Sequence, residues 1–341
     1  MKHQTFFKVV LCCSLMAIAV LSAQVQGQPP QSRGRGLYGD WKLKVDYGGR
    51  QFDSILSFSR DKEGNRTAQW ISFMGLYEVK DLSYEDGKLS FATERPNREG
   101  QIRTTKFIGT IQEGKLTGIL SSERGENKVE GARMPRIPRA VGSWQMKFKV
   151  GERDITTTLI VKVDKANNLA AEWQSQWGEH SISDVKYERG NLSFKRKSTF
   201  QDRQWESTFA GTIQRETDTL SGVISVPEMG EIKAEGKRIG GPLVGDWIIE
   251  STFEGRTRKQ RLRVNPDMSG LYGSIPIKKV NFEEGRVDFL LVLQFGDQSF
   301  EMTFDGKLED SKLTGEMTSS RGSQKIKGTK IVRSFRRRSP Q

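Results

Sequence analysis

The chain contains very few of the residues that carry out most covalent and metal chemistry. Its 341 residues include two cysteines, Cys12 and Cys13, and two histidines, His3 and His180. Both cysteines and His3 lie in an N-terminal segment with the pattern of a cleaved export signal. The expected mature chain therefore has no thiol and one histidine, which excludes disulfides, cysteine nucleophiles and paired-histidine metal centres. We expect neither a cofactor nor a bound metal.

The chain also lacks a hydrophobic run long enough to span a bilayer. Lys2 and Lys8 precede or border the apolar run at 9–21, and small residues follow it, so residues 1–23 are predicted to be a secretory signal peptide. A membrane-spanning helix needs about 20 apolar residues, so no transmembrane segment is expected after cleavage. We expect a secreted or periplasmic protein with a disordered leader over 24–36.

Acidic residues are too few to balance the basic ones. Removal of the signal leaves 53 basic and 42 acidic residues, a net charge of +11, part of it in a predicted basic tail at 334–341. Such a charge is typical of a soluble secreted protein with basic ends, or of one attracted to anionic polymers or membrane surfaces. Export and the lack of a recognition motif argue against a nucleic-acid partner.

What the chain does contain is one pattern that occurs three times. Each copy opens with Gly-x-Trp and ends with a cation, and the openings lie 103 residues apart: Gly39-Asp40-Trp41 with Arg133, Gly142-Ser143-Trp144 with Arg238, and Gly245-Asp246-Trp247 with Lys330. A repeat of this length determines the domain count. We predict three domains, over 37–134, 140–239 and 243–333, joined by short proline-containing linkers.

Apolar and polar residues alternate with a period of two within each copy. In the second copy Trp144, Met146 and Phe148 alternate with Gln145 and Lys147, which predicts strands with one buried face. Turn signals divide this copy into eight strands that begin near Ser143, Asp154, Leu169, Ser181, Asn191, Arg203, Thr219 and Glu231. Eight sequential strands favour a small antiparallel up-and-down β-barrel, and a two-sheet sandwich is the alternative.

Glycines recur inside the predicted strands, on the same face as large apolar residues. The two sets are Gly109, Gly211 and Gly306, and Gly118, Gly222 and Gly315. Glycine inside a strand marks a bend or the close approach of another group. We predict that these glycines make room for the ring of the Gly-x-Trp tryptophan.

A Gly-x-Trp on the first strand, answered by a cation on the last, resembles the calycin superfamily of lipocalins, fatty-acid-binding proteins and avidins. The resemblance implies that the tryptophan closes one barrel end while the cation lies over its ring, an interaction of about 0.5–2 kcal/mol. The barrel-closing pairs would be Trp41 with Arg133, Trp144 with Arg238 and Trp247 with Lys330. It further implies carriage of a small apolar ligand, although the repeats are shorter than lipocalins and carry no later lipocalin motif.

Catalysis is not expected, because no carboxylate is shared by all three copies. A divergent hydrolase site remains an alternative in the second copy, where Glu172, Glu179 and Asp184 lie near two tryptophans and a glycosidase needs two carboxylates. His180, next to Gly178 and Glu179, is expected to be exposed in a turn.

Aromatic residues of the second copy are the stronger functional lead. Trp177 and Trp205, flanked by Arg203 and Lys197, are suited to stacking on sugar rings or apolar ligands, whereas Trp173 is expected in the core. We predict a non-catalytic binding or scaffold protein whose partner is an anionic or sugar polymer of the cell envelope. The alternatives are a carrier of a small apolar ligand and a carbohydrate-active hydrolase.

Overall fold

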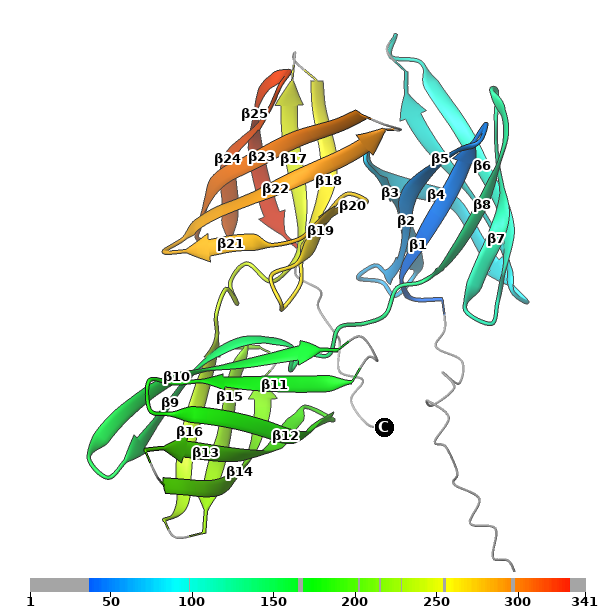
Figure 1. Cartoon of the computed structure of the whole chain (residues 1–341). Coiled ribbons are helices and arrows are strands. Elements are labelled where there is room, and N and C mark those ends of the chain that lie inside the picture. The colour runs from blue at the N-terminus through cyan, green and yellow to red at the C-terminus, as the bar shows by residue number, and fades with distance from the viewer. Residues whose placement is uncertain are drawn as a thin grey trace, which may run out of the picture. The chain divides into compact units, whose positions relative to one another are not determined.

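In the computed structural model, the described residues are 37–97, 99–164, 168–201, 203–214, 216–227, 229–253, 256–295 and 298–331. The predicted signal peptide (1–23), leader (24–36) and basic tail (334–341) lie outside these ranges. Every regular element within them is a β-strand (Figure 1). The described residues from Tyr38 to Ile331 belong to one compact unit.

The first eight strands form a closed antiparallel barrel, here called barrel 1. Each strand pairs with the next, and β1 pairs with β8, which closes the cylinder. The strands are β1 (Gly39–Tyr47), β2 (Arg50–Arg60), β3 (Arg66–Ser72), β4 (Gly75–Glu85), β5 (Lys88–Pro96), β6 (Ile102–Gln112), β7 (Lys115–Ser122) and β8 (Gly125–Arg133).

The next eight strands form barrel 2, in which β9 pairs with β16 and the remaining neighbours pair in order up to a seam between β11 and β12. The strands are β9 (Gly142–Val150), β10 (Arg153–Val163), β11 (Leu169–Gln174), β12 (Glu179–Glu188), β13 (Asn191–Phe200), β14 (Arg203–Gln214), β15 (Thr219–Val226) and β16 (Gly230–Arg238). Each of the eight predicted strand starts lies within two residues of the observed one.

Barrel 3 has nine strands because its fourth strand is divided in two. Its strands are β17 (Gly245–Phe253), β18 (Arg256–Val264), β19 (Gly270–Tyr272), β20 (Ile275–Ile277), β21 (Val280–Glu283), β22 (Arg286–Phe295), β23 (Gln298–Glu309), β24 (Lys312–Ser319) and β25 (Gly322–Lys330). The prediction of three tandem antiparallel barrels is confirmed, and the sandwich alternative is wrong because first and last strands pair in all three.

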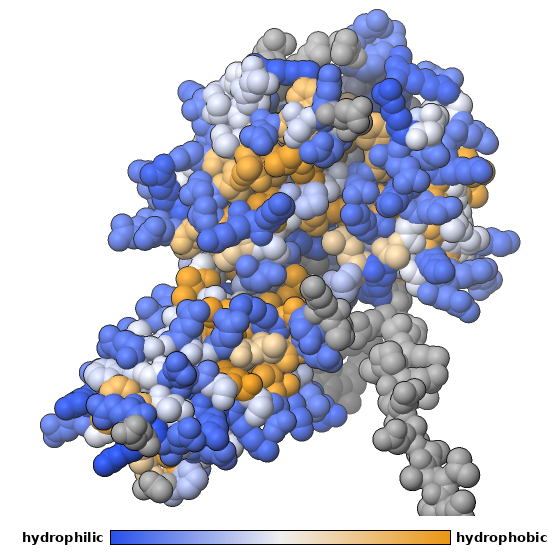
Figure 2. Space-filling view, viewed as in Figure 1, coloured by the Kyte–Doolittle hydropathy of each residue, from blue (hydrophilic) through white to orange (hydrophobic). Residues whose placement is uncertain are grey.

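Strand alternation explains the core of each barrel. In barrel 2 the inward residues Trp144, Met146, Leu159 and Val161 are fully buried, whereas their sequence neighbours are more accessible. Hydrophilic residues predominate on the face shown in Figure 2, with an apolar patch over barrel 3 where β22 lies. The exposed apolar residues of that strand are Leu290 and Val292.

The inward glycines accommodate a phenylalanine ring rather than the tryptophan, so our prediction of their partner is wrong. A Cβ atom on Gly109 would lie 2.5 Å from Cζ of Phe107 and 2.3 Å from the carbonyl oxygen of Thr117. The other two barrels repeat this arrangement with Phe209 and Phe304. Each ring stacks on the inward phenylalanine of the preceding strand, at 4.8–5.0 Å between centroids. The glycines therefore let this aromatic pair lie against the backbone.

A buried ionic cluster joins barrel 1 to barrel 3. Asp40 of the first Gly-x-Trp lies 2.7 Å from Nη2 of Arg261 and 2.6 Å from Nη1 of Arg263. Arg263 also pairs with Asp246, the equivalent acid of barrel 3, at 2.7 Å. Burial alone would raise the pKa of Asp40, but the two arginines outweigh it and lower that pKa to about 2. Ser143 of barrel 2 occupies the third equivalent position and carries no charge.

The β3–β4 turn of barrel 1 makes a second contact with barrel 3. Phe73 in this turn packs against the buried apolar cluster of barrel 3. The amide Nε2 of Gln260 donates to the carbonyl of Ser72 at 2.8 Å, and both residues are buried. Barrels 1 and 3 therefore share buried polar contacts as well as apolar ones.

Candidate functional site: the barrel 2 cavity

Barrel 2 contains a cavity of about 270 Å³ at the end remote from its Gly-x-Trp. β9 starts beside Trp144, but the residues it contributes to the cavity, Phe148 and Val150, come from its other end. The antiparallel strand β10 contributes Arg153 and Ile155 from its beginning. The cavity therefore occupies the half of the barrel that the buried Trp144 does not fill.

Aromatic and aliphatic side chains make up most of the cavity wall. Trp173 is buried and packs between Phe148 and Phe194, with ring centroids 6.1 and 6.2 Å away. At the rim, Trp177 contacts Phe200 edge to face at 6.3 Å, and both side chains are partly exposed. Such a wall favours an apolar ligand of limited size.

One cation, Arg196, is buried in this apolar surrounding. It projects inward from β13, is 8% exposed, and its guanidinium carbon lies 4.5 Å from the centroid of the Trp173 ring. Its Nε donates to Oγ of Ser207 at 3.2 Å. Burial lowers the pKa of Arg196 to about 10, and no carboxylate within the described ranges pairs with it.

Two polar groups of the lining have hydrogen-bonding capacity left over. Nδ1 of His180 lies 2.9 Å from Oγ of Ser198, whereas its Nε2 has no partner among the described residues. Oγ1 of Thr157 is likewise buried without a partner there. Burial, and then the charge of Arg196, lower the pKa of His180, so its ring is neutral near pH 7. Buried polar atoms are normally satisfied, so these two require an explanation.

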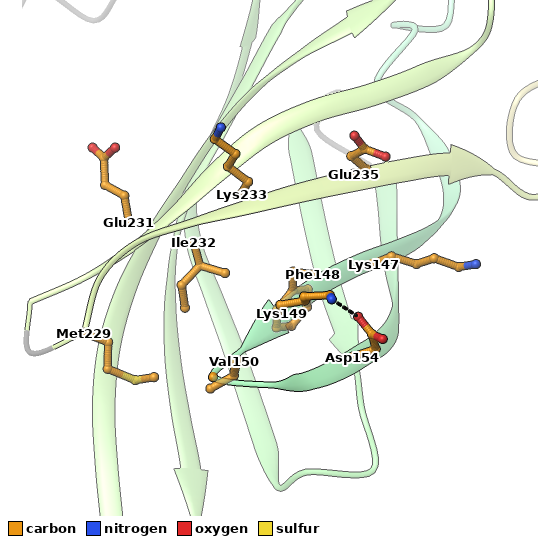
Figure 3. Close-up of a pocket in the computed structure, with 11 residues that line it drawn as sticks. Lys147, Phe148, Lys149, Val150, Asp154, Met229, Glu231, Ile232, Lys233 and Glu235 are labelled. Carbon is orange, nitrogen blue, oxygen red and sulfur yellow. Dashed lines mark ion pairs between the residues drawn. The ribbon is translucent and has the colours of Figure 1, made fainter.

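A second hollow of about 610 Å³ lies against the wall where β9 and β16 separate. The two strands pair only from Trp144 with Arg238 to Phe148 with Ala234. Figure 3 shows Val150 and Met229 on the two sides of the gap beyond that point. Both residues line the cavity as well as the hollow. The hollow and the cavity therefore adjoin each other where the two strands separate.

Lysines and carboxylates alternate around this hollow. The lysines are Lys147, Lys149 and Lys233, and the acids are Asp154, Glu231 and Glu235. The ion pair between Lys149 and Asp154, drawn in Figure 3, has an N–O distance of 3.7 Å. The charges around the hollow are therefore mixed, in contrast to the cavity beside it.

The structure brings only part of the predicted ligand-binding group together. Trp177 and Trp205 both line the cavity. Lys197 and Arg203 are exposed and do not line it, because strand alternation directs them to the outer face or to the end of a hairpin. The four residues therefore do not form one surface patch of rings and cations.

The six predicted barrel-closing residues lie at the ends of their first and last strands. In barrel 2 the Arg238 guanidinium carbon is 4.1 Å from the centroid of the Trp144 ring, and in barrel 3 Nζ of Lys330 is 5.5 Å from that of Trp247. In barrel 1, Trp41 is buried and opposite Arg133 in the strand register.

These residues also bind the chain that enters each barrel. Nε1 of Trp144 donates to the carbonyl of Ala140, and the guanidinium of Arg238 donates to the carbonyls of Arg139 and Val141. In barrel 3, Trp247 and Lys330 donate to the carbonyls of Leu243 and Pro242, and in barrel 1 Arg133 donates to that of Tyr38. The Gly-x-Trp glycines adopt φ angles of 116–136°, which place this chain across the barrel end and are strained for other residues.

The carboxylates of the hydrolase alternative face solvent. Glu172 pairs with Lys162 at 2.7 Å, and Asp184 pairs with Lys195 at 2.9 Å. Asp184 has a φ of 55° at a bulge in β12, and Glu179 is exposed. None of the three lines the cavity. The described residues contain no cluster of three or more groups suited to holding a metal ion.

Our expectation for His180 is wrong, and Arg196 was missed. His180 is the second residue of β12 rather than a turn residue, and alternation turns it toward the cavity. Arg196 lies on the same inward face of β13 as Leu192, Phe194 and Ser198. The alternation that identifies the strand therefore also predicts that the Arg196 side chain points inward.

No protein-family model and no curated protein sequence matches the chain. No helix in the described part of the chain is long and apolar enough to cross a membrane. Among solved structures, the chain is similar to a candidate outer membrane protein from Bacteroides fragilis, with 11% identity over 58% of this chain and 96% of that one and a TM-score of 0.23.

Two further structures show the same level of similarity. A protein of unknown function in the DUF3598 family from Nostoc punctiforme has 11% identity, covers 86% of this chain and 96% of its own, and has a TM-score of 0.20. A variant of the vaccine antigen transferrin-binding protein B from Haemophilus parasuis has 10% identity, coverages of 87% and 76%, and a TM-score of 0.20. Similarities at these scores carry no argument about function, which must come from the site itself.

Proposed function

We propose that this is a non-catalytic binding protein that holds a small, largely apolar ligand inside barrel 2. The observation that carries the proposal is the 270 Å³ cavity, which is walled by aromatic and aliphatic side chains and adjoins the gap between β9 and β16. A calycin-like barrel and action outside the cytoplasm are parts of the same proposal. The second of these depends on the N-terminal residues alone.

We prefer this function to recognition of an anionic or sugar polymer. Polymer recognition required Trp177 and Trp205 to share a surface with Lys197 and Arg203, and the two tryptophans instead line the cavity without the two cations. A hydrolase is supported less, because its candidate carboxylates face solvent in ion pairs.

The size of the cavity limits the ligand. A cavity of about 150 Å³ holds benzene in an engineered protein, so 270 Å³ accommodates roughly ten non-hydrogen atoms. Octan-1-ol is a suitable uncharged probe. We expect it to bind the full mature chain in isothermal titration calorimetry with a negative heat-capacity change, because apolar surface is removed from water.

The test uses a variant that fills the cavity. Ile224 lines it, so Ile224→Phe should reduce octan-1-ol affinity at least tenfold. Ile108→Phe adds the same ring at an exposed position of barrel 1 and should leave binding unchanged. If octan-1-ol and other small apolar or amphiphilic molecules of this size fail to bind, or bind both variants equally well, the proposed function is wrong.

A further inference from the structure

The ionisable residues of the barrel 2 cavity are all basic. Among the described residues, the charged or titratable side chains that line it are Arg153, Arg196 and His180. The carboxylates nearby belong to the outer hollow. An apolar cavity with cations and no acid disfavours a positively charged ligand and favours a negatively charged one.

Arg196 is the strongest of these features. It is 8% exposed, and its guanidinium contacts the Trp173 ring and the hydroxyl of Ser207. Buried charges in proteins are normally paired, because an isolated ion is poorly solvated there. Its terminal nitrogens make no hydrogen bond to the described residues, which leaves a planar fork of donors for a carboxylate or similar group.

The two unsatisfied atoms of the lining match the same ligand group. The hydroxyl of Thr157 can donate to an anion. If Nδ1 of His180 accepts from the Ser198 hydroxyl, its Nε2 carries the hydrogen and also donates. Three donors from three different strands then face a cavity whose described lining includes no carboxylate.

Only barrel 2 presents a cation at this position. The phenylalanines that stack in the three cores are equivalent, and the residue two positions further along each strand is Thr93 in barrel 1, Arg196 in barrel 2 and Leu291 in barrel 3. All three are buried. The barrel fold therefore tolerates an uncharged residue here, so closure of the barrel does not explain Arg196.

From these observations we infer that the ligand of barrel 2 is an anionic amphiphile of about ten non-hydrogen atoms, whose acid group binds Arg196, Thr157 and His180. Its apolar part lies along the aromatic wall toward the gap between β9 and β16. This inference rests on the proposed function, and adds to it the chemical class of the ligand and the residues that recognise its charge.

The test compares octanoate with octan-1-ol, which share a chain length and differ in charge. Isothermal titration calorimetry on the full mature chain should show octanoate binding at least tenfold more tightly. Arg196→Leu, which installs the residue that barrel 3 has naturally, should abolish this preference while octan-1-ol still binds. Lys197→Leu, one residue away on the outer face, should leave both affinities unchanged. Arg196→Lys keeps the charge without the planar fork and should retain part of the preference.

Each outcome separates the two proposals. Equal affinity for octanoate and octan-1-ol in the unmodified protein, or a preference that survives Arg196→Leu, overturns the inference but leaves the proposed function intact. Binding of neither probe overturns both. Circular dichroism of each variant confirms that the barrels are folded before affinities are compared.

Discussion

Without ligand, Arg196→Leu should make barrel 2 more stable rather than less stable. Replacement of a charged core residue by an apolar one usually destabilises a protein only when it leaves a partner charge buried and unpaired. Arg196 has no carboxylate partner among the described residues, so its replacement leaves no buried charge uncompensated.

The size of the effect follows from the surroundings of Arg196. Burial lowers its pKa to about 10 from 12.5, which corresponds to ~3 kcal/mol of unfavourable free energy for the charged form. The contact with the Trp173 ring returns about 0.5–2 kcal/mol, and the hydrogen bond to Ser207 about 1 kcal/mol. Leucine adds apolar burial, so we expect a net gain of about 1–2 kcal/mol.

Hydrogen exchange of the β13 and β14 amides measures this gain, because it reports the opening of barrel 2 separately from the other barrels. Protection should increase in Arg196→Leu and remain within about 0.5 kcal/mol of the unmodified protein in Lys197→Leu. A loss of more than about 1 kcal/mol in Arg196→Leu would refute the reasoning, because it would mean that the folded barrel already satisfies the charge.

Three further results are expected. Asp40→Asn should lower the free energy of unfolding by about 3–5 kcal/mol at pH 7 in urea denaturation, because it leaves Arg261 buried without its partner. Because the Asp40 pKa is lowered to about 2, the stabilisation by its carboxylate is present above pH 3.8 and is lost as the pH falls toward 2. The variant and the unmodified protein should therefore have similar stabilities near pH 2. Gly109→Ala should destabilise barrel 1 by about 1–3 kcal/mol, measured by thermal unfolding, because its Cβ atom would overlap the Phe107 ring and the carbonyl oxygen of Thr117. Octanoate affinity, measured by calorimetry, should rise as the pH falls below 6.5, because the pKa of His180 is lowered from that value and protonation of its ring then adds a charge beside the bound carboxylate; His180→Gln should remove this dependence.

The barrels could be predicted from the sequence because apolar and polar residues alternate along each strand. Trp144, Met146 and Phe148 alternate with polar residues and are the core of β9. The contact between barrels could not be predicted in the same way. Arg261 and Arg263 alternate outward on β18 and look like solvent-facing residues, and only their burial against Asp40 distinguishes them. A single sequence contains no signal that these two arginines, which lie far from Asp40 in the chain, contact it in the fold.

The candidate site was predicted in part, for a related reason. Trp177 and Trp205 were identified by residue type, and they do line the cavity. To predict that Arg196 points inward, the alternation along the strand had to be given more weight than the usual preference of arginine for the surface. Our prediction that a tryptophan packs against the inward glycines was wrong, because the sequence shows that space is needed but not which of two rings fills it.

The equivalence of Thr93, Arg196 and Leu291 has a consequence for how such a protein diversifies. A hydroxyl, a guanidinium and an isobutyl group are accommodated at one position of one architecture, while the closing tryptophan and the glycine pairs stay the same. After duplication of such a unit, one substitution can alter the chemical preference of a barrel without a new fold having to arise. Leu291→Arg tests this idea by transplanting the cation into the third copy.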